Sequence, residues 1–439
     1  MHVNVDGQNR VATGSIFAGV TPYHWLVVII ASMGWLFDCM DQRLFVLARQ
    51  PALADLLGAA ASSDATATYG GYATTSMILG WATGGIIFGL LSDRVGRVKT
   101  MTLTLLVYSG FTGLSGFAHG WLDFTIYRFL AGIGIGGMFG AATTLVAESV
   151  PGQFRVLALG ALQALSATGN ILGSIVSFWI PPGGMTWGVP GWRLLFLIGI
   201  VPSLLAVPIV FLLKEPQAWL DARALAQQGG GARTGSLSEL FGHPRWRHHA
   251  IIGLMLGVSG MVGLWGIGFF SPELISTALQ GEPQPVIDRV RALGTAFQDV
   301  GAFLGMLAFT FVAAFLSRRA AFFGALVISM AATMFVFRSL QSASDAYWML
   351  PMMGFAQMSV FAGYSIYFPE LFPTRLRGTG VGFCYNTVRY LAAPAPILLG
   401  YLASLLSFRT AAVAMSAVYL VGMVALLWAP ETKGETLPE

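Results

Sequence analysis

Long apolar stretches follow one another along nearly the whole chain, with short polar segments between them. A helix needs about 20 apolar residues to cross the roughly 30 Å hydrocarbon layer of a membrane. The apolar runs are continuous and do not alternate with polar positions, which favours helices over the strands of a barrel. The pattern predicts twelve spans, near residues 23–48, 70–91, 100–118, 123–147, 157–181, 192–213, 249–279, 290–315, 320–340, 346–368, 379–405 and 409–429.

The composition agrees with an all-α membrane protein. Hydrophobic residues make up 55% of the 439-residue chain and charged residues 10%, and the mean hydropathy is +0.70. The net charge of +4 comes from loops without an aromatic-interleaved basic stripe, so we expect no nucleic-acid partner. Cys39 and Cys384 fall inside predicted spans without metal-ligand spacing, so we predict no metal site and no cofactor.

Basic residues predict how the spans are oriented, because positive charge gathers in cytoplasmic loops. In the twelve-span arrangement most of them fall on one side, and both termini lie on that side, in the cytoplasm. The residues on that side are Arg94, Arg97, Lys99, Arg155, Lys214, Arg223, Arg233, Arg245, Arg247, Arg318, Arg319, Arg375, Arg377 and Lys433. The polar amino terminus lacks the basic region and cleavage site of a removable signal peptide.

The spans divide into two halves that repeat. A polar segment at 214–248 contains Gly229–Gly231 and separates a bundle at 1–213 from a bundle at 249–439. The sequence E-S-V-P-G-Q-F-R at 148–155 matches E-L-F-P-T-R-L-R at 370–377. Glu148 and Glu370 are 222 positions apart, as are Gly160 and Gly382, so two six-span bundles related by pseudo-symmetry are expected.

Three motifs carry a resemblance to the major facilitator superfamily. Residues 89–99 read G-L-L-S-D-R-V-G-R-V-K and match that superfamily's motif between spans two and three. Residues 128–137, R-F-L-A-G-I-G-I-G-G, resemble its fourth-span motif, and the tail P-E-T-K-G-E-T-L at 430–437 is similar to that of sugar porters. The resemblance implies a secondary transporter in which two bundles rock about a central site. The counterpart loop at 316–321, L-S-R-R-A-A, lacks an Asp and a Gly, so the second charge cluster is expected to hold more loosely.

Charged residues at the ends of the spans are candidates for a cytoplasmic gate. Capping of helix ends and fixing of topology explain part of their presence. On the resemblance we also expect ion pairs between the bundles that break when the protein opens inward. The gate candidates are Asp93, Arg94, Arg97, Glu148, Arg155, Glu370 and Arg377.

Charges inside a span are costly and usually functional. Asp38 and Asp41 share one face of the first span, and Arg128 lies at a neighbouring depth in the fourth. A carboxyl group balanced between burial and an arginine suits a proton switch, although a fixed pair that only holds the bundle together is the alternative. Proton-driven sugar porters resemble this arrangement. The string G-W-L-F-D-C-M-D at 34–41 also resembles the G-W-x-x-D-G-F-D of organic-acid symporters, with Cys39 and Met40 as departures.

Arg389 is the candidate for binding an anion. It shares a face of the eleventh span with Tyr385 and Asn386, near the membrane midplane, and its planar guanidinium suits a carboxylate. Organic-acid symporters resemble this chain in having an Arg there. The alternative is that Asp299 neutralises Arg389 permanently. Further polar or stacking candidates for the cavity are Gln163, Asn170, Gln298, Gln357, Tyr364 and Trp265.

Together these features predict a proton-coupled symporter of a small organic anion such as a carboxylate, with alternating access. We expect a monomer in the lipid bilayer of a plasma membrane, such as a bacterial inner membrane, with protons and the solute as its partners. A sugar or polyol carrier is the first alternative and a drug efflux antiporter the second. A membrane sensor would need a larger soluble domain, and no catalytic constellation for an enzyme is present in the sequence.

Overall fold

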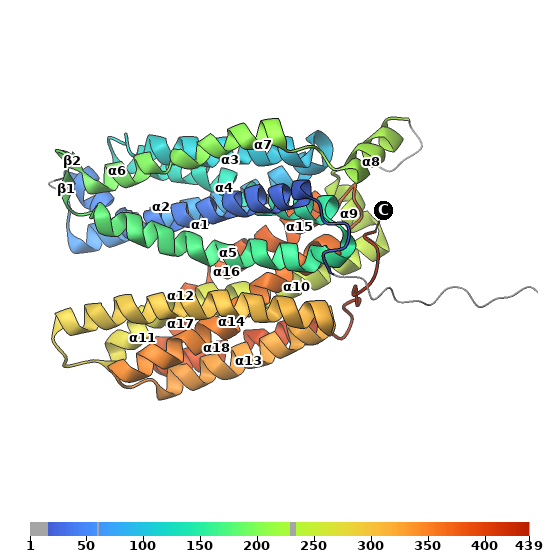
Figure 1. Cartoon of the computed structure of the whole chain (residues 1–439). Coiled ribbons are helices and arrows are strands. Elements are labelled where there is room, and N and C mark those ends of the chain that lie inside the picture. Colours follow the sequence, from blue (N-terminus) through green and yellow to red (C-terminus); the bar gives the residue numbers. More distant parts are fainter. Residues whose placement is uncertain (1–15, 59–60, 229–233, 439) are drawn as a thin grey trace, which may run out of the picture.

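The computed structural model describes residues 16–58, 61–228 and 234–438. These residues form helices almost throughout, with one short hairpin (Figure 1). The first fifteen residues, the three glycines at 229–231 and Arg233, all used in the sequence argument, lie outside the described residues.

The first half begins with five long helices. They are α1 (Pro22–Leu57), α2 (Ser63–Val95), α3 (Arg97–Ser115), α4 (Trp121–Ser149) and α5 (Gly152–Trp179). A hairpin of β1 (Met185–Thr186) and β2 (Val189–Pro190) follows, in which Met185 pairs with Pro190 and Thr186 with Val189. The sixth crossing consists of α6 (Gly191–Ile198), the 3₁₀ turn η2 (Val201–Leu205) and α7 (Ala206–Leu212).

A linker with two short helices, α8 (Gln217–Gln227) and α9 (Leu237–Gly242), leads to the second half. That half contains α10 (Pro244–Gly266), the 3₁₀ turn η3 (Gly268–Phe270), α11 (Ser271–Ala278), α12 (Gln284–Phe315), α13 (Arg318–Ser339) and α14 (Ala343–Leu371). It ends with α15 (Arg377–Asn386), α16 (Val388–Ala392), α17 (Ala395–Leu405), α18 (Phe408–Met415) and α19 (Val418–Ala425).

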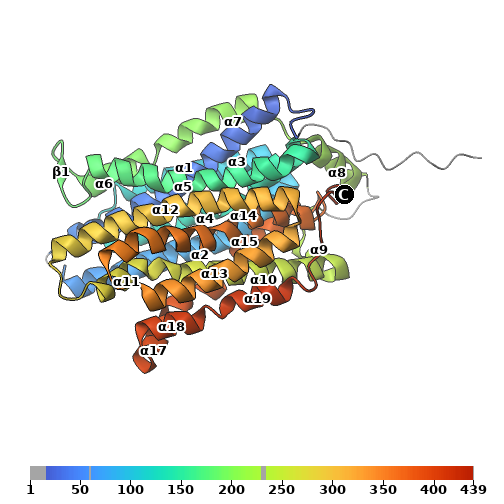
Figure 2. The same ribbon diagram turned by 60° about the horizontal axis from the view of Figure 1, so that its bottom comes forward.

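The two halves lie against each other with their long helices roughly aligned (Figures 1 and 2). We call the end of the molecule that carries α8, α9 and the carboxyl terminus the linker end, and the end that carries β1 and β2 the hairpin end (Figure 1). Across the boundary α2 packs against α15, and α5 packs against α12 and α14. Helices from both halves therefore surround a shared interior.

Small residues allow the helices of each half to approach closely. Gly132 and Gly136 of α4 lie against the backbone of α2 at Met77 and Trp81, where a side chain would collide with a carbonyl oxygen. Inside a membrane the hydrophobic effect does not hold helices together. Glycines compensate because they let the helix backbones pack closely.

Nine helices of the described residues are long and apolar enough to span a membrane. The predicted spans at 100–118, 346–368 and 379–405 correspond to α3, α14 and α15–α17, which are not among them. Threonines, serines and tyrosines lower the hydropathy of α3 and α14, and the last segment is interrupted near Thr387 and Pro394. The all-helical fold agrees with the sequence, whereas the count of twelve spans stays a prediction.

Candidate functional site

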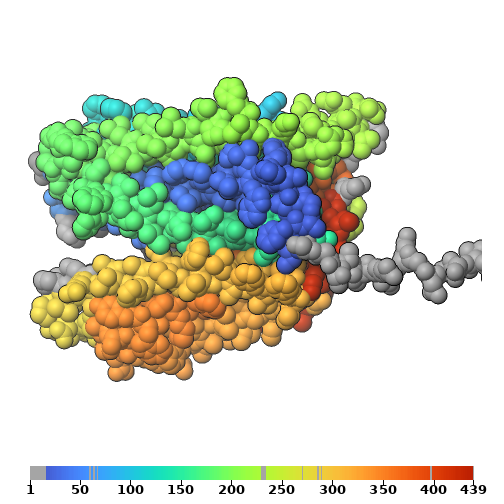
Figure 3. Space-filling view, in the orientation of Figure 1, coloured from blue at the N-terminus to red at the C-terminus, as the bar shows by residue number. Residues whose placement is uncertain are grey.

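A cavity of about 410 Å³ lies between the two halves. In the space-filling view the halves separate toward the hairpin end and meet toward the linker end (Figure 3). Eight of the predicted site residues line this cavity: Gln163, Asn170, Trp265, Gln298, Asp299, Gln357, Tyr385 and Arg389. Aromatic side chains that the sequence did not single out, Trp35, Trp81 and Phe361, complete its walls.

Arg389 presents its guanidinium group to this cavity from α16. It lies just past the break between α15 and α16, and its Nη1 donates to the backbone oxygen of Tyr385 at 2.7 Å and to Oδ1 of Asn386 at 2.9 Å. The group stacks on Trp81 of the first half, 3.7 Å from the ring centroid. No carboxylate in the described part of the chain lies within ion-pair distance of it.

Asn386 does not line the cavity, but it holds Arg389 in place. Its Nδ2 donates to the backbone oxygen of Gly382 at 3.0 Å and to that of Gly136 in the first half at 3.4 Å. Tyr385 stacks on Phe139 of the first half, with ring centroids 3.7 Å apart. The residues that hold Arg389, the candidate for anion binding, therefore contact both halves.

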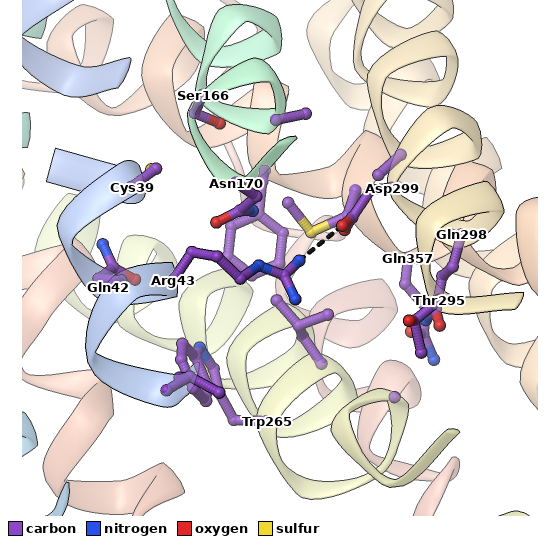
Figure 4. A pocket seen from close by; sticks show the side chains of 18 of the residues that line it. Cys39, Gln42, Arg43, Ser166, Asn170, Trp265, Thr295, Gln298, Asp299 and Gln357 are labelled. Carbon is purple, nitrogen blue, oxygen red and sulfur yellow. Dashed lines mark hydrogen bonds and ion pairs between the residues drawn. The ribbon is translucent and has the colours of Figure 1, made fainter. Parts of the chain in front are cut away.

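Asp299 pairs with Arg43, a residue that the sequence argument missed. Nη2 of Arg43 in α1 lies 2.6 Å from Oδ2 of Asp299 in α12, so this ion pair links the two halves across the cavity (Figure 4). The alternative in which Asp299 neutralises Arg389 does not describe this structure. Arg43 lies in the first predicted span, so the rule that singled out Asp38 and Asp41 would also have found it.

Asp41 and Arg128 form a buried ion pair. Nη1 of Arg128 lies 3.5 Å from Oδ2 of Asp41, and both side chains are fully buried. Arg128 also donates to Ser115 and Thr112, with oxygen distances of 3.0 and 2.8 Å. Its guanidinium carbon lies 4.9 Å from the ring centroid of Phe196. Arg128 is thus held by several partners, whereas Asp41 depends on Arg128.

Asp38 lies one turn earlier in α1 and has no such partner. It is fully buried and has no ion-pair partner among the described residues, although the side-chain amide of Gln42 is a donor beside it. Asp41 and Arg389 are the charged groups that act on it, Asp41 more strongly than Arg389. Because an isolated buried carboxylate is costly, Asp38 needs either a proton or a nearby positive charge. Asp38 is therefore a candidate for proton binding, with Arg389 as a source of nearby positive charge.

Tyr364 lies away from the cavity lining. Its hydroxyl donates to the backbone oxygen of Leu256 at 2.7 Å, and its ring stacks on Phe368 at 5.0 Å. Gln357 does line the cavity and donates to Thr333 at 2.9 Å. Tyr364 therefore packs within the second half, and the buried Oε1 of Gln357 has no hydrogen-bond partner among the described residues.

The linker end is closed by buried polar contacts between the halves. Asp93, at the end of α2, accepts hydrogen bonds from the backbone nitrogens of Gly378 and Thr379 at 2.9 and 2.8 Å, and from the Thr379 hydroxyl at 2.6 Å. It thus caps the amino terminus of α15, where free N–H groups and the helix dipole favour a carboxylate. Arg97 lies 3.1 Å from the same carboxylate.

Glu148 forms a second bridge beside this cap. It accepts two hydrogen bonds of 2.9 Å from Arg97 of its own half and one from Arg377 of the other half. All three side chains are fully buried. We call Asp93, Arg97, Glu148, Arg377 and Thr379 the linker-end latch. It brings together four of the seven gate residues predicted from the sequence.

The other gate candidates lie around this latch. Arg94 donates to the backbone oxygen of Gly235 in the linker at 3.0 Å. Arg155 donates to the backbone oxygen of Ala147 at 2.9 Å. Glu370 pairs with Arg318 inside the second half at 2.9 Å. These three secure the linker and the separate halves.

The second charge cluster is well bonded, contrary to the expectation from its degenerate loop. Two hydrogen bonds, of 2.9 and 3.2 Å, join Arg318 to Glu370. Thr432 in the carboxyl-terminal tail donates to the same carboxylate. However, the loop lacks an equivalent of Asp93, and within the described ranges no hydrogen bond or ion pair joins Arg318 or Glu370 to the first half. The missing Asp removes the crossing contact and leaves the local one intact.

Two glutamates cap equivalent helices in the two halves. Glu215 accepts from the backbone nitrogens of Arg97, Val98 and Lys99 at 2.7, 3.1 and 3.2 Å. Glu431, in the tail motif, accepts from those of Arg318 and Arg319 at 3.0 and 3.2 Å. Burial alone would raise the pKa of Glu431, but these backbone hydrogen bonds outweigh it and lower the pKa. The tail motif thus has a structural task at the start of α13.

Comparisons with known proteins agree with this arrangement. The cis,cis-muconate transport protein of Acinetobacter baylyi is 31% identical over 366 residues, which cover 81% of this chain and 83% of that protein. A probable 4-methylmuconolactone transporter of Cupriavidus pinatubonensis is 26% identical over 91% of this chain and 89% of its own length.

Among solved structures, the proton:xylose symporter XylE bound to 6-bromo-6-deoxy-D-glucose superposes with a TM-score of 0.78. It has 21% sequence identity and covers 94% of this chain and 98% of XylE. The family model of the Major Facilitator Superfamily matches residues 25–395. A chain of two helical halves around a central cavity, with this match over most of its length, belongs to the major facilitator superfamily of membrane transporters.

Proposed function

We propose that this transporter is a proton-coupled symporter of small organic anions. The observation that carries the proposal is Arg389, a guanidinium group that lines the central cavity and has no carboxylate partner among the described residues. A planar fork with free N–H groups matches a carboxylate and has no equivalent use for a neutral sugar. The names of the two relatives, which concern muconate and a muconolactone, favour the same class of solute.

Asp38 is the proposed proton carrier. Its buried carboxyl group has no ion-pair partner among the described residues, and the charge of Arg389 acts on it. When an anion neutralises Arg389, the positive charge that balances an ionised Asp38 is lost, so proton binding at Asp38 becomes more favourable. Anion and proton then bind together, as symport requires. Asp41 is a second candidate for proton coupling, and its carboxylate is paired with Arg128.

The linker-end latch is the proposed cytoplasmic gate. The structure corresponds to a state closed at this end, and inward opening requires the contacts of Asp93 and Glu148 with α15 to break. The basic loops on the same side favour a cytoplasmic location for both termini. We propose a monomer in the bacterial inner membrane.

A sugar or polyol carrier is the second candidate, and the tail motif is the feature that favours it. In this structure Glu431 caps α13, and Lys433 donates to the backbone oxygens of Phe315 and Leu316 at 2.6 and 2.9 Å. These contacts account for the motif through helix capping at the linker end. The tail therefore gives no preference for a sugar.

A thermal-shift panel on the purified protein tests the solute class. Benzoate, hexa-2,4-dienoate, cis,cis-muconate, xylose and glucose are compared at equal concentration, because a ligand that binds only the folded state raises its stability. We expect the anions to raise the melting temperature and the sugars to leave it unchanged. Stabilisation by sugars alone would overturn the anion assignment.

A further inference from the structure

The cavity contains two guanidinium groups, one from each half, and only Arg389 has a use in the proposed function. We propose that Arg43 is a second carboxylate site and that the preferred substrate is a dicarboxylate bound between Arg43 and Arg389. This inference rests on the proposed function, because it takes Arg389 as the first carboxylate site. It adds a specificity-determining residue and a narrower class of solute.

The bond that now holds Arg43 is one that a ligand can replace. Among the described residues Arg43 makes a single hydrogen bond, from Nη2 to Asp299, and both side chains are 25% exposed. The pairs of the linker-end latch, in contrast, are multiply bonded and 0% exposed. The Arg43–Asp299 pair is thus partly buried and rests on one contact, so fewer bonds hold it than hold the pairs of the latch. A carboxylate entering the cavity can therefore compete with Asp299 for the Arg43 guanidinium group.

The position of Arg43 favours this exchange. Gln42 and Arg43 reach from α1 into the cavity, and the guanidinium group of Arg43 lies among side chains of both halves (Figure 4). Gly173 of α5 lies against the Arg43 stem, where a side chain would crowd its Cβ and Cγ atoms. Because Gly173 has no side chain, the Arg43 stem can pass close to α5.

A dicarboxylate that displaced Asp299 from Arg43 would break one bridge between the two halves and form another. At present Arg43 of the first half and Asp299 of the second form a bridge across the cavity. A ligand with one carboxylate on Arg43 and the other on Arg389 again joins the two halves. A monocarboxylate on Arg389 leaves the Arg43–Asp299 bridge in place. The two classes of ligand therefore depend on different residues.

The test compares cis,cis-muconate with hexa-2,4-dienoate, which has the same conjugated chain with one carboxylate fewer. Trp35, Trp81 and Trp265 line the cavity, so tryptophan fluorescence of the purified protein reports binding directly. In the double variant Arg43→Gln/Asp299→Asn no charge is left unpaired. We expect it to weaken muconate binding about tenfold or more, as for loss of a hydrogen bond to a charged group, and to change hexadienoate binding by less than about twofold.

The single variant Asp299→Asn frees Arg43 and should tighten muconate binding. Glu273→Gln removes the same charge from another part of the lining and leaves the Arg43 pair intact, so it measures the general electrostatic effect. We expect Asp299→Asn to exceed Glu273→Gln for muconate. Equal effects of the two variants, or equal losses for both ligands in the double variant, would overturn the dicarboxylate site.

The two proposals fail in different ways. If neither anion binds the parent protein, or if Arg389→Lys changes neither affinity, the proposed function is wrong. If hexadienoate binds through Arg389 while muconate is indifferent to Arg43, the proposed function stands and the second site is wrong. Hexadienoate binding also verifies that each Arg43 variant has folded.

Discussion

Single charged residues decide what this cavity can bind and exchange. Asp38 and Arg389 differ from the other buried charges because, within the described ranges, neither has an ion-pair partner of opposite charge within 4.0 Å. Asp41 with Arg128, and Glu148 with Arg97 and Arg377, are paired. An unpaired buried charge is energetically costly. Binding of a proton to Asp38 or of an anion to Arg389 would therefore lower the free energy most at these two residues.

Replacing Asp38 with Asn should separate transport from its driving force. The amide cannot release a proton, so we expect accumulation driven by a pH gradient to fall to the level of empty liposomes, while counterflow exchange of labelled solute continues. Both are measured in proteoliposomes. Asp38→Glu serves as the control because it keeps a titratable group. Gradient-driven accumulation by Asp38→Asn at the parent level would remove this residue from coupling.

Replacing Arg389 with Lys should weaken anion binding although the charge is kept. Lysine loses the fork for a carboxylate and the flat contact with Trp81. We expect the dissociation constant for hexadienoate to rise about tenfold or more in a fluorescence titration. Arg247→Lys, at an exposed position of α10, is the matched control and should not change it. An unchanged affinity in Arg389→Lys would show that the anion binds elsewhere.

At the scale of elements, contacts at helix ends connect the two halves. The carboxylate of Asp93 belongs to α2, but the helix it caps is α15 of the other half. A cap within one helix stabilises that helix, whereas this cap stabilises one arrangement of the two halves. Its strength therefore influences how often the linker end opens.

The variant Asp93→Asn should shift the protein toward a state open at the linker end. An amide is a weaker acceptor for the helix terminus and loses the ion pair with Arg97, which costs about 1 kcal/mol or more. Spin labels at Lys99→Cys and Arg319→Cys, both exposed and one in each half, report the separation of this end. We expect a population at longer distance.

The matched control is Asp123→Asn in the same labelled background. Asp123 also caps a helix, accepting from the backbone nitrogens of His119, Gly120 and Phe124, but all of these belong to its own half. The control should leave the distance distribution unchanged. Identical distributions for Asp93→Asn and the parent would mean that the cap does not hold the gate.

The cap at Glu431 predicts a pH-dependent contribution to stability. Its pKa is lowered in the folded state by backbone hydrogen bonds at the start of α13, despite the opposing effect of burial. A lowered folded pKa means that the stabilisation is complete above the unfolded value of about 4.3 and is lost as the pH falls through the folded value.

Glu431→Gln should therefore lower the melting temperature at pH 7, with a cost of about 1 kcal/mol typical of a lost cap. The difference from the parent should shrink toward pH 3, where the glutamate is protonated as well. Thermal unfolding in detergent across this range measures it. A difference that grows as the pH falls would contradict the sign of the effect.

The sequence motifs predicted where helices end better than they predicted which residues the charged side chains contact. The residues at 89–99 and 148–155 indicated charged span ends, and the structure has them at the ends of α2, α3, α4 and α5. The contact between the Asp93 carboxylate and the backbone of α15 could not be read from sequence, because Asp93 and Gly378 are 285 positions apart and meet only through the packing of the two halves. The same limit applies to Asp299, whose partner is on α1 and not on its own half.

At the scale of the whole molecule, the repeat is symmetric in its helices and asymmetric in its contacts. Glu148 and Glu370 occupy equivalent positions, yet Glu148 bonds to both halves and Glu370 stays within the second. Two of the connections between the halves involve ion pairs, the latch at the linker end and the partly buried Arg43–Asp299 bridge in the cavity. On the proposed mechanism the first resists opening of the linker end, and the second lies in the lining of the cavity that would hold the solute.

The most direct test of the account is accumulation of an organic anion driven by a proton gradient. Proteoliposomes are loaded at alkaline pH, diluted into acidic buffer with labelled cis,cis-muconate, and compared with vesicles whose gradient is collapsed by a protonophore. The account predicts accumulation above the external concentration that the protonophore abolishes and excess hexadienoate reduces. Equal muconate levels with and without the gradient, or gradient-driven accumulation of xylose in place of muconate, would contradict it.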